Sequence, residues 1–242
     1  MSTPTPRGRP IRAVVLVAAL AVALALTWWV SRPQGSVPGS PGRSRVEALV
    51  SAVAVVPERV KRPGYQRDCS GTAACVFGPA WSDSTTAPGS GNGCPTRQDV
   101  LARDLVGAAR DPGDGCAVRG GRLVDPYSGA VVDVAVTGVR GIHVDHVLPL
   151  AAAWDLGAAD WPAPLRARFA NDVDLNLLAV SGPVNTAKGD ATPAAWMPPD
   201  PRRHCFYAAR YLGVAVAYGL PVTEADRDEL RRAARRCPAD GA

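Results

Sequence analysis

The sequence predicts an α+β domain that is held by disulfide bonds and follows an apolar N-terminal helix. Short β-type runs and helical patterns both occur along the chain, without an internal repeat. The 23 prolines and 24 glycines indicate many loops and short elements instead of long helices. Six cysteines follow the apolar stretch, which is typical of exported proteins. With 242 residues, the chain can form one good-sized core with appendages.

Residues 1–30 are predicted to be a signal peptide or an N-terminal membrane anchor. Three arginines precede an apolar run that begins at residue 13 and closes on Trp28 and Trp29. A basic flank before such a run indicates export by the positive-inside rule. The run of about 17–18 residues reaches the lower limit for spanning a bilayer, and Ala23-Leu24-Ala25 offers a cleavage site, so both forms stay open. In either form we expect the rest of the chain to be secreted or anchored to the outer face of the cytoplasmic membrane.

The formal net charge of +5 is weak evidence for binding to nucleic acid. Without the three arginines of the leader, 24 basic and 22 acidic residues remain, which leaves the body of the protein near +2. Basic clusters such as Arg166 and Arg168 could contact phosphates, but basic surface faces are common.

After the leader, the sequence predicts a linker, one domain and a short tail. Residues 31–62 are assigned to a linker: residues 31–44 are rich in Pro, Gly and Ser, and residues 46–56 carry a short helical pattern that we expect to pack against the domain. Residues 63–238 form the predicted domain, and residues 239–242 a tail. Within the domain we expect, in order, a helix from Thr96 to about Arg110, strands at 122–124 and 130–134 around a turn at 125–129, a strand near 139–147, a helix around Trp154, a helix at 206–218 and a helix at 224–236 capped by Thr223.

The even cysteine count predicts three disulfides. Six cysteines allow fifteen pairings, and the sequence alone does not choose among them. We favour the local scheme, in which Cys69 pairs with Cys75, Cys94 with Cys116, and Cys205 with Cys237. A zinc site is the competing interpretation, which the absence of a Cys-x-x-Cys spacing disfavours.

Four residues of the central stretch carry the chemistry of phosphodiester hydrolysis. A neutral imidazole serves as a base near neutral pH, which makes His146 suitable. Asp145 and the amide oxygen of Asn185 are oxygen donors of the kind that Mg²⁺ prefers. Lys188, one helical turn beyond Asn185, could meet a phosphate. Because neighbours on a straight strand point to opposite faces, Asp145 and His146 can share a site only if the strand ends or twists there, and Pro149 just beyond favours this.

These residues also resemble a known family. Val144-Asp145-His146-Val147-Leu148-Pro149, Asn176-Leu177-Leu178 and Asn185-x-x-Lys188 are similar to the HNH (ββα-metal) endonucleases in which the third motif residue is Asn. The flanking text from about Gly64 to Cys237 resembles the exported bacterial branch that is related to the C-terminal domain of GmrSD-type restriction endonucleases. Its motifs are Cys94-Pro95-Thr96-Arg97, Asp125-Pro126-Tyr127-Ser128-Gly129, Ala153-Trp154, Phe169-Ala170-Asn171-Asp172 and Ala195-Trp196-Met197-Pro198.

The resemblance implies an HNH ββα-metal core in which a two-stranded ribbon and a helix clasp one divalent ion, Mg²⁺ or Mn²⁺. It implies that His146 is the general base, that Asp145 and Asn185 are the metal ligands, and that Asn176 braces the loop and orients His146. Lys188 would be an electrostatic helper. Two departures stand out: the Cys69–Cys75 insertion, and His143, which alternates with Asp145 on the strand and which we treat as a bystander.

We therefore expect an exported, metal-dependent endonuclease of low sequence specificity, with DNA favoured over RNA as substrate. We expect a membrane contact only through an uncleaved leader, and no obligate protein partner. Two alternatives remain open: a non-catalytic extracellular binding domain with the same fold, and a phosphodiesterase for smaller substrates. For single residues, Asn185 could be only a helix cap and Asn176 only a turn residue. A Ser/His/Asp hydrolase is disfavoured because the sequence has no Gly-x-Ser-x-Gly elbow.

Overall fold

The computed structural model describes residue 37, residues 40–69 and residues 75–240. The predicted leader, residues 1–30, lies outside this part of the chain. None of the helices within the described ranges has the length and apolar character that a membrane span requires.

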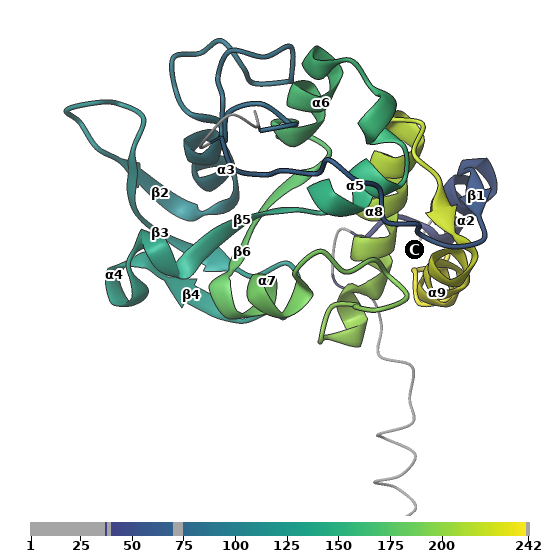
Figure 1. The fold of residues 1–242 in the computed structure, drawn as a ribbon. Coiled ribbons are helices and arrows are strands. Elements are labelled where there is room, and N and C mark those ends of the chain that lie inside the picture. The colour runs from purple at the N-terminus through teal and green to yellow at the C-terminus, as the bar shows by residue number, and fades with distance from the viewer. Residues whose placement is uncertain (1–36, 38–39, 70–74, 241–242) are drawn as a thin grey trace, which may run out of the picture. The chain divides into compact units, whose positions relative to one another are not determined.

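The described residues contain eight α-helices, three short 3₁₀ helices and seven strands, joined by loops in a mixed α+β arrangement (Figure 1). The helices are α2 (Arg43–Ala52), α3 (Thr96–Asp104), α4 (Val134–Thr137), α5 (Leu150–Asp155), α6 (Ala163–Ala170), α7 (Gly182–Lys188), α8 (His204–Ala217) and α9 (Glu224–Ala234). The strands are β1 (Val55–Val56), β2 (Val106–Arg110), β3 (Val118–Val124), β4 (Val131–Asp133), β5 (Ile142–His146), β6 (Leu177–Ser181) and β7 (Val222–Thr223).

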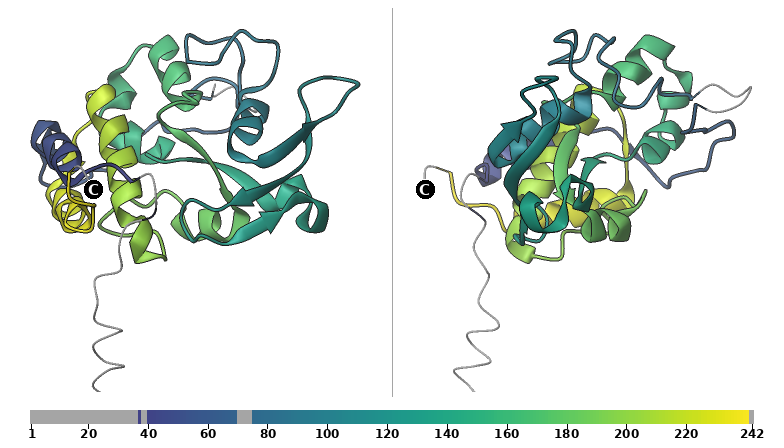
Figure 2. Two further views of the ribbon diagram at one scale, coloured as in Figure 1. Left: turned by 180° about the vertical axis from the view of Figure 1, so that it is seen from behind. Right: turned by 90° about the vertical axis from the view of Figure 1, so that its left-hand side faces the viewer.

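The strands form three small sheets. β2, β3 and β4 make an antiparallel sheet, β5 and β6 an antiparallel pair, and β1 and β7 a short parallel pair. Figure 2 shows the same arrangement from two further sides: the β2–β3–β4 sheet lies at one side of the domain, α2, α8 and α9 lie at the other, and the β5–β6 pair runs between them. The expected hairpin turn at 125–129 joins β3 to β4.

The β5–β6 pair separates two hydrophobic cores, because successive strand residues face opposite sides. On one side, Ile142 and Val144 of β5 pack with Leu177 and Ala179 of β6 in the smaller core, together with α3 and β3. On the other side, Leu178 and Val180 join the larger core around α8. Buried tyrosines of this core, including Tyr127 and Tyr207, pack edge to face at 5.5 Å.

The predicted helix from Thr96 to about Arg110 is wrong in its second half. Helix α3 ends at Asp104, and β2 follows from Val106 to Arg110. Residues of β2 pair with β3, for example Val106 with Arg122, so tertiary pairing overrides the local helical pattern. The last predicted helix is confirmed as α9, which begins at Glu224 behind a capping box of Thr223 and Asp226.

Residues 43–62, which the sequence analysis assigns to the linker segment, pack within the same unit as the rest of the domain. Helix α2 buries Val46 and Val50 in the larger core, in contact with α8 and α9. Strand β1 pairs with β7, and the backbone N–H of Arg43 donates to the carbonyl of Pro238 at 3.0 Å. This segment and the C-terminal end of the chain therefore stabilise each other.

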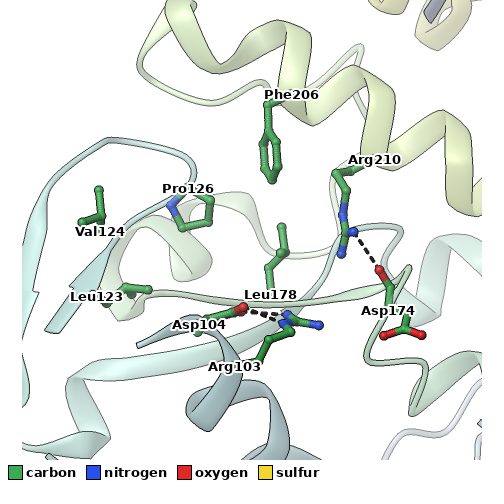
Figure 3. A pocket seen from close by; sticks show the side chains of 10 residues that line it. Arg103, Asp104, Leu123, Val124, Pro126, Asp174, Leu178, Phe206 and Arg210 are labelled. Carbon is green, nitrogen blue, oxygen red and sulfur yellow. Dashed lines mark hydrogen bonds and ion pairs between the residues drawn. The ribbon is translucent and has the colours of Figure 1, made fainter. Parts of the chain in front are cut away.

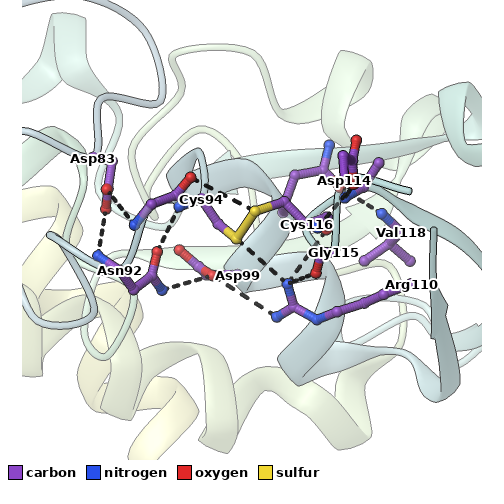
Figure 4. Close-up of a disulfide and its surroundings, with 12 residues drawn as sticks. Asp83, Asn92, Cys94, Asp99, Arg110, Asp114, Gly115, Cys116 and Val118 are labelled. Carbon is purple, nitrogen blue, oxygen red and sulfur yellow. Dashed lines mark hydrogen bonds and ion pairs between the residues drawn. A yellow bond between two sulfur atoms is a disulfide. The ribbon is translucent and has the colours of Figure 1, made fainter. Parts of the chain in front are cut away.

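The three disulfides of the local scheme are present: Cys69–Cys75, Cys94–Cys116 and Cys205–Cys237. Cys94–Cys116 joins the start of α3 to the β2–β3 turn, where Arg110 donates to the carbonyls of Gly115 and Cys116 (Figure 4). Cys205–Cys237 joins α8 to the end of α9, as expected. All cysteines are paired, so none is left as a zinc ligand.

Candidate functional site

The candidate site is built on β5, β6 and α7, which follow the strand–strand–helix order that the resemblance implies. In the antiparallel register, His143 pairs with Val180, Asp145 with Leu178, and His146 with Leu177. Helix α7 begins at Gly182, directly after β6. His143 and Asp145 therefore share one face of β5, and His146 lies on the opposite face at the strand's last position.

Asp145, His146 and Asn185 line a single pocket of about 310 Å³. Strand β5 ends at His146, which lets neighbouring side chains on opposite faces reach the same opening at the strand end. Tyr65 and Arg67, from the irregular segment before the first disulfide, line another part of its wall. The structure thus brings together the three residues to which the sequence analysis gives the base and the metal ligands.

His146 is buried and fixed by two contacts. Its Nε2 lies 2.9 Å from the carbonyl oxygen of Ala170, and its ring stacks on Trp81 with 5.7 Å between centroids and 13° between planes. A carbonyl only accepts, so a neutral ring carries its proton on Nε2, and Nδ1 keeps the lone pair. Burial lowers the pKa of His146 from 6.5 to about 3, which leaves the imidazole neutral at physiological pH.

Trp81 adopts a backbone conformation that a bulky side chain rarely takes. Its φ of 58° is the one positive value among the described residues other than glycine. The backbone N–H of Thr96 donates to the carbonyl of Trp81 at 3.2 Å, and the Thr96 hydroxyl donates to the carbonyl of Ser82 at 3.0 Å. These bonds hold the turn that stacks the indole on the imidazole.

Asp145 is held by two hydrogen bonds in a buried setting. Its Oδ2 accepts from the Tyr127 hydroxyl at 2.7 Å, and its Oδ1 pairs with Nζ of Lys188 at 2.9 Å. Burial raises the pKa of Asp145, and the positive charge and hydrogen bond of Lys188 oppose this rise. Lys188 also donates to the carbonyl of His146 at 2.9 Å, and only 2% of its surface is exposed. Its ammonium group is therefore engaged beneath the pocket and is not free to meet a phosphate there.

Asn185 lies inside α7, whose N-cap residue is Ser181, so the helix-cap interpretation of Asn185 is wrong. Its Nδ2 lies 3.4 Å from Nδ1 of His143, which connects β5 to α7 on the Asp145 face. His143, treated as a bystander from the sequence, therefore contacts a predicted metal ligand. Its alternation with Asp145 was the signal for this position.

Asn176 is fully buried and braces the chain on both sides of the site. Its Oδ1 accepts from the N–H of Leu148 at 3.0 Å, its Nδ2 donates to the carbonyl of Phe169 at 3.3 Å, and its own carbonyl accepts from the N–H of Val147 at 2.8 Å. These bonds fix the segment immediately after His146.

The residues present fit a hard divalent cation held by few protein ligands. Within the described ranges, no three His, Cys, Asp or Glu side chains gather as a metal cluster. A carboxylate offers roughly four lone-pair positions, so Asp145 can still bind an ion beside its two hydrogen bonds. Asn185 adds an amide oxygen, and Mg²⁺ commonly keeps several waters and takes one or two carboxylates.

A second pocket, of about 350 Å³, shares no lining residue with the first. Figure 3 shows Phe206 and Arg210 of α8 above Leu178, with Arg103 and Asp104 of α3 below. Arg103 pairs with Asp104 at 2.6 Å, and Arg210 donates to the carbonyl of Asp174 at 2.7 Å. No residue predicted for the site lines this pocket.

Comparison with known proteins shows which family the chain belongs to. Residues 96–233 match the family of the C-terminal domain of GmrSD restriction endonucleases. The chain belongs to this family. An uncharacterized secreted protein of Arthroderma benhamiae is 35% identical over 206 residues, which are 85% of this chain and 91% of that protein. No solved structure matches.

The GmrSD family match contains Asp145, His146, Asn176, Asn185 and Lys188, and it begins well after Tyr65 and Arg67. Parts of the site also come from outside the central stretch, and the sequence did not predict them. Tyr127 had a signal, since it belongs to the turn motif at 125–129, but Trp81 and Arg67 reach the site only through tertiary packing.

Proposed function

We propose that this protein is a metal-dependent endonuclease that hydrolyses phosphodiester bonds of nucleic acid outside the cytoplasm, with DNA favoured as substrate. The observation that carries this proposal is the single pocket lined by Asp145, His146 and Asn185. Membership of the GmrSD endonuclease family supports the reaction class. The three disulfides and the secreted relative support the location.

His146 acts as the general base. Its Nδ1 lone pair accepts a proton from water as the water oxygen attacks phosphorus, and the bond between phosphorus and the leaving oxygen breaks. The leaving oxygen takes a proton from solvent water, and the imidazolium returns its proton to solvent. The carbonyl of Ala170 holds the other ring nitrogen, and Trp81 covers one face of the ring, so the imidazole keeps one orientation. An approaching phosphate anion favours the protonated ring, which raises the proton affinity of this buried base.

Asp145 and Asn185 would hold the divalent ion, which when bound supplies positive charge for the phosphate and the leaving oxygen. Tyr127 and Lys188 orient the Asp145 carboxylate from behind, and His143 contacts the Asn185 amide. Partners that orient ligands in this way commonly set metal affinity and activity.

The decisive test is nicking of supercoiled plasmid DNA across a panel of metals. We expect nicking with Mg²⁺ or Mn²⁺, no nicking with EDTA, and a loss of at least a hundredfold in the His146→Ala variant. His204→Ala is the matched control, because His204 also contacts a carbonyl, that of Pro198 at 2.9 Å, but does not line the pocket. Because His146 packs under Trp81, thermal unfolding of each variant must accompany the assay.

Two outcomes would favour the other functions. DNA binding without cutting under any divalent ion would make the protein a binding domain. Hydrolysis of bis(p-nitrophenyl) phosphate without plasmid nicking would make it a phosphodiesterase for small substrates. Equal nicking by wild type and His146→Ala would remove His146 from the mechanism.

A further inference from the structure

The irregular segment at residues 57–68 is fixed against the candidate site, although it precedes the part of the chain that matches the family. Arg59 pairs with Asp155 of α5 at 2.7 Å and with Asp190, just after α7, at 2.9 Å. Arg62 makes a two-pronged contact with Asp160 at 2.6 and 2.8 Å. These contacts anchor the segment to α5, to the 3₁₀ turn at Ala158–Asp160 and to the chain after α7; residues at the start of α5 and just after α7 line the pocket.

Further contacts hold Pro63 and Tyr65, two residues that lie between Arg62 and Arg67. The indole N–H of Trp154 donates to the carbonyl of Pro63 at 3.1 Å, and the ring of Tyr65 packs against Trp154 at 6.4 Å and against Phe77 at 6.4 Å. Tyr65 and Arg67 then line the pocket beside Asp145 and His146. Arg67 is thus held at the site by the packing on its N-terminal side.

Arg67 differs from the other cations near the pocket. Arg59 and Lys61 pair with Asp155 and Asp190, and Lys188 is buried against Asp145. Arg67 is exposed, is the one cationic residue that lines the pocket, and forms no ion pair with a described residue. It also lines a small adjacent pocket together with Trp81 and His146.

The charge distribution agrees with this placement. Burial is the main cause of the low pKa of His146, and the positive charge of Arg67 lowers that pKa further. Arg67 also opposes the rise that burial causes in the pKa of Asp145. Its guanidinium therefore acts electrostatically on both residues at which the reaction is proposed.

We propose that Arg67 binds the phosphate group of the substrate, the task that the sequence analysis gives to Lys188. The planar guanidinium can donate two parallel hydrogen bonds to non-bridging phosphate oxygens, and an exposed arginine that has no ion pair within the described part of the chain loses little other bonding by doing so. The segment before residue 96 is then part of the nucleic-acid site. This inference rests on the proposed function for the nature of the substrate, but phosphate binding is measurable without cleavage.

The test uses the full-length chain in the His146→Ala background, so that no DNA is cut. Binding of a fluorescein-labelled DNA duplex is measured by anisotropy from 50 to 200 mM NaCl for three proteins: the one that keeps Arg67, Arg67→Ala and Arg67→Lys. We expect Arg67→Ala to weaken DNA binding roughly five- to twentyfold. The logarithm of the association constant should also fall less steeply with the logarithm of the NaCl concentration, with a slope smaller in magnitude by about 1. Arg67→Lys should keep the slope, because it keeps the charge, but should still bind more weakly. Arg231→Ala, on α9 and paired with Asp228, should change neither quantity.

Each outcome separates the two proposals. Unchanged affinity and slope in Arg67→Ala, with cleavage by the His146-containing protein intact, would overturn the role of Arg67 alone. Arg67-dependent binding in a protein that never cuts DNA would overturn the nuclease and keep the phosphate site. If neither the wild-type protein nor the His146→Ala protein binds DNA at any of these salt concentrations, both the nuclease proposal and the phosphate-binding role of Arg67 would be overturned. Circular dichroism spectra of the variants should coincide, because Arg67 is exposed.

Discussion

At the scale of single residues, the site depends on buried polar groups that are each paired. Asp145, His146, Asn176 and Lys188 have between 0 and 8% of their surface exposed. Each makes at least one hydrogen bond to a neighbour, which is what burial of polar groups requires. The pocket is therefore a rigid, preorganised arrangement in which a change at one residue affects the others.

Substitution of Lys188 tests whether its side chain stabilises the fold or acts on the substrate. Its Nζ is buried between the Asp145 carboxylate and the His146 carbonyl, so Lys188→Ala leaves a buried carboxylate without its counter-charge. We expect this variant to lose about 3–5 kcal/mol of unfolding free energy in urea titrations. Lys61→Ala, whose side chain is 73% exposed, should change stability by less than about 1 kcal/mol. An unchanged stability in Lys188→Ala with lost activity would instead favour the electrostatic-helper role.

His146 gives the protein a predictable pH dependence. Its pKa is 6.5 when unfolded and about 3 when folded, so between these values the unfolded chain binds more protons. Stability is therefore fully present above pH 6.5 and decreases as pH falls toward 3, by about 3 kcal/mol between pH 7 and pH 4. Urea titrations of wild type and His146→Asn across this range should differ by that amount. Parallel curves for the two proteins would contradict the burial of a neutral imidazole.

At the scale of secondary-structure elements, sequence patterns predicted what local chemistry determines. The turn at 125–129, the strand carrying His146 and the capping box of α9 all follow from residue types at fixed spacings. The second half of the helix predicted after Thr96 is wrong, because this segment forms β2 and pairs with β3. The residue pattern of one segment does not show which other segment will pair with it.

The same distinction applies to the candidate site. Asp145, His146 and Asn185 were found from local motifs, and the pocket that they share follows from β5 ending at His146. The stack of Trp81 on His146 joins residues 65 positions apart in the sequence and needs a left-handed turn, and no local pattern predicts either feature. The burial of Lys188 could not be predicted from the sequence either, because its position depends on how α7 packs against β5.

The disulfide between α8 and the end of α9 tests how far these helices depend on a covalent link. Cys205–Cys237 closes a loop of 32 residues, and Cys69–Cys75 closes one of 6. In the chain-entropy account, a longer loop restricts the unfolded chain more. We expect removal of Cys205–Cys237 by paired Cys→Ala substitutions to lower the unfolding free energy by about 2–4 kcal/mol. Removal of Cys69–Cys75 should cause a smaller loss, and the difference between the two losses should be about 1–2 kcal/mol. Equal losses, measured by chemical denaturation, would contradict this order.

At the scale of the whole molecule, the domain extends beyond the part that matches the family. Helix α2 packs on α8 and α9, and residues 57–68 are anchored by ion pairs beside the pocket. The helical pattern at residues 46–56 supplies core residues, as expected from the sequence, and the segment after it supplies Tyr65 and Arg67. The relative from Arthroderma benhamiae aligns over 85% of this chain, so its similarity also extends beyond residues 96–233.

The proposed reaction depends on a divalent ion being held at the end of β5. The most direct test is anomalous X-ray scattering from crystals of the wild-type protein soaked in Mn²⁺. We predict one strong peak in the pocket, bonded to a carboxylate oxygen of Asp145 and the amide oxygen of Asn185, with His146 beside it. A peak elsewhere, or an Asp145 that stays bound only to Tyr127 and Lys188 at saturating Mn²⁺, would contradict the proposed site.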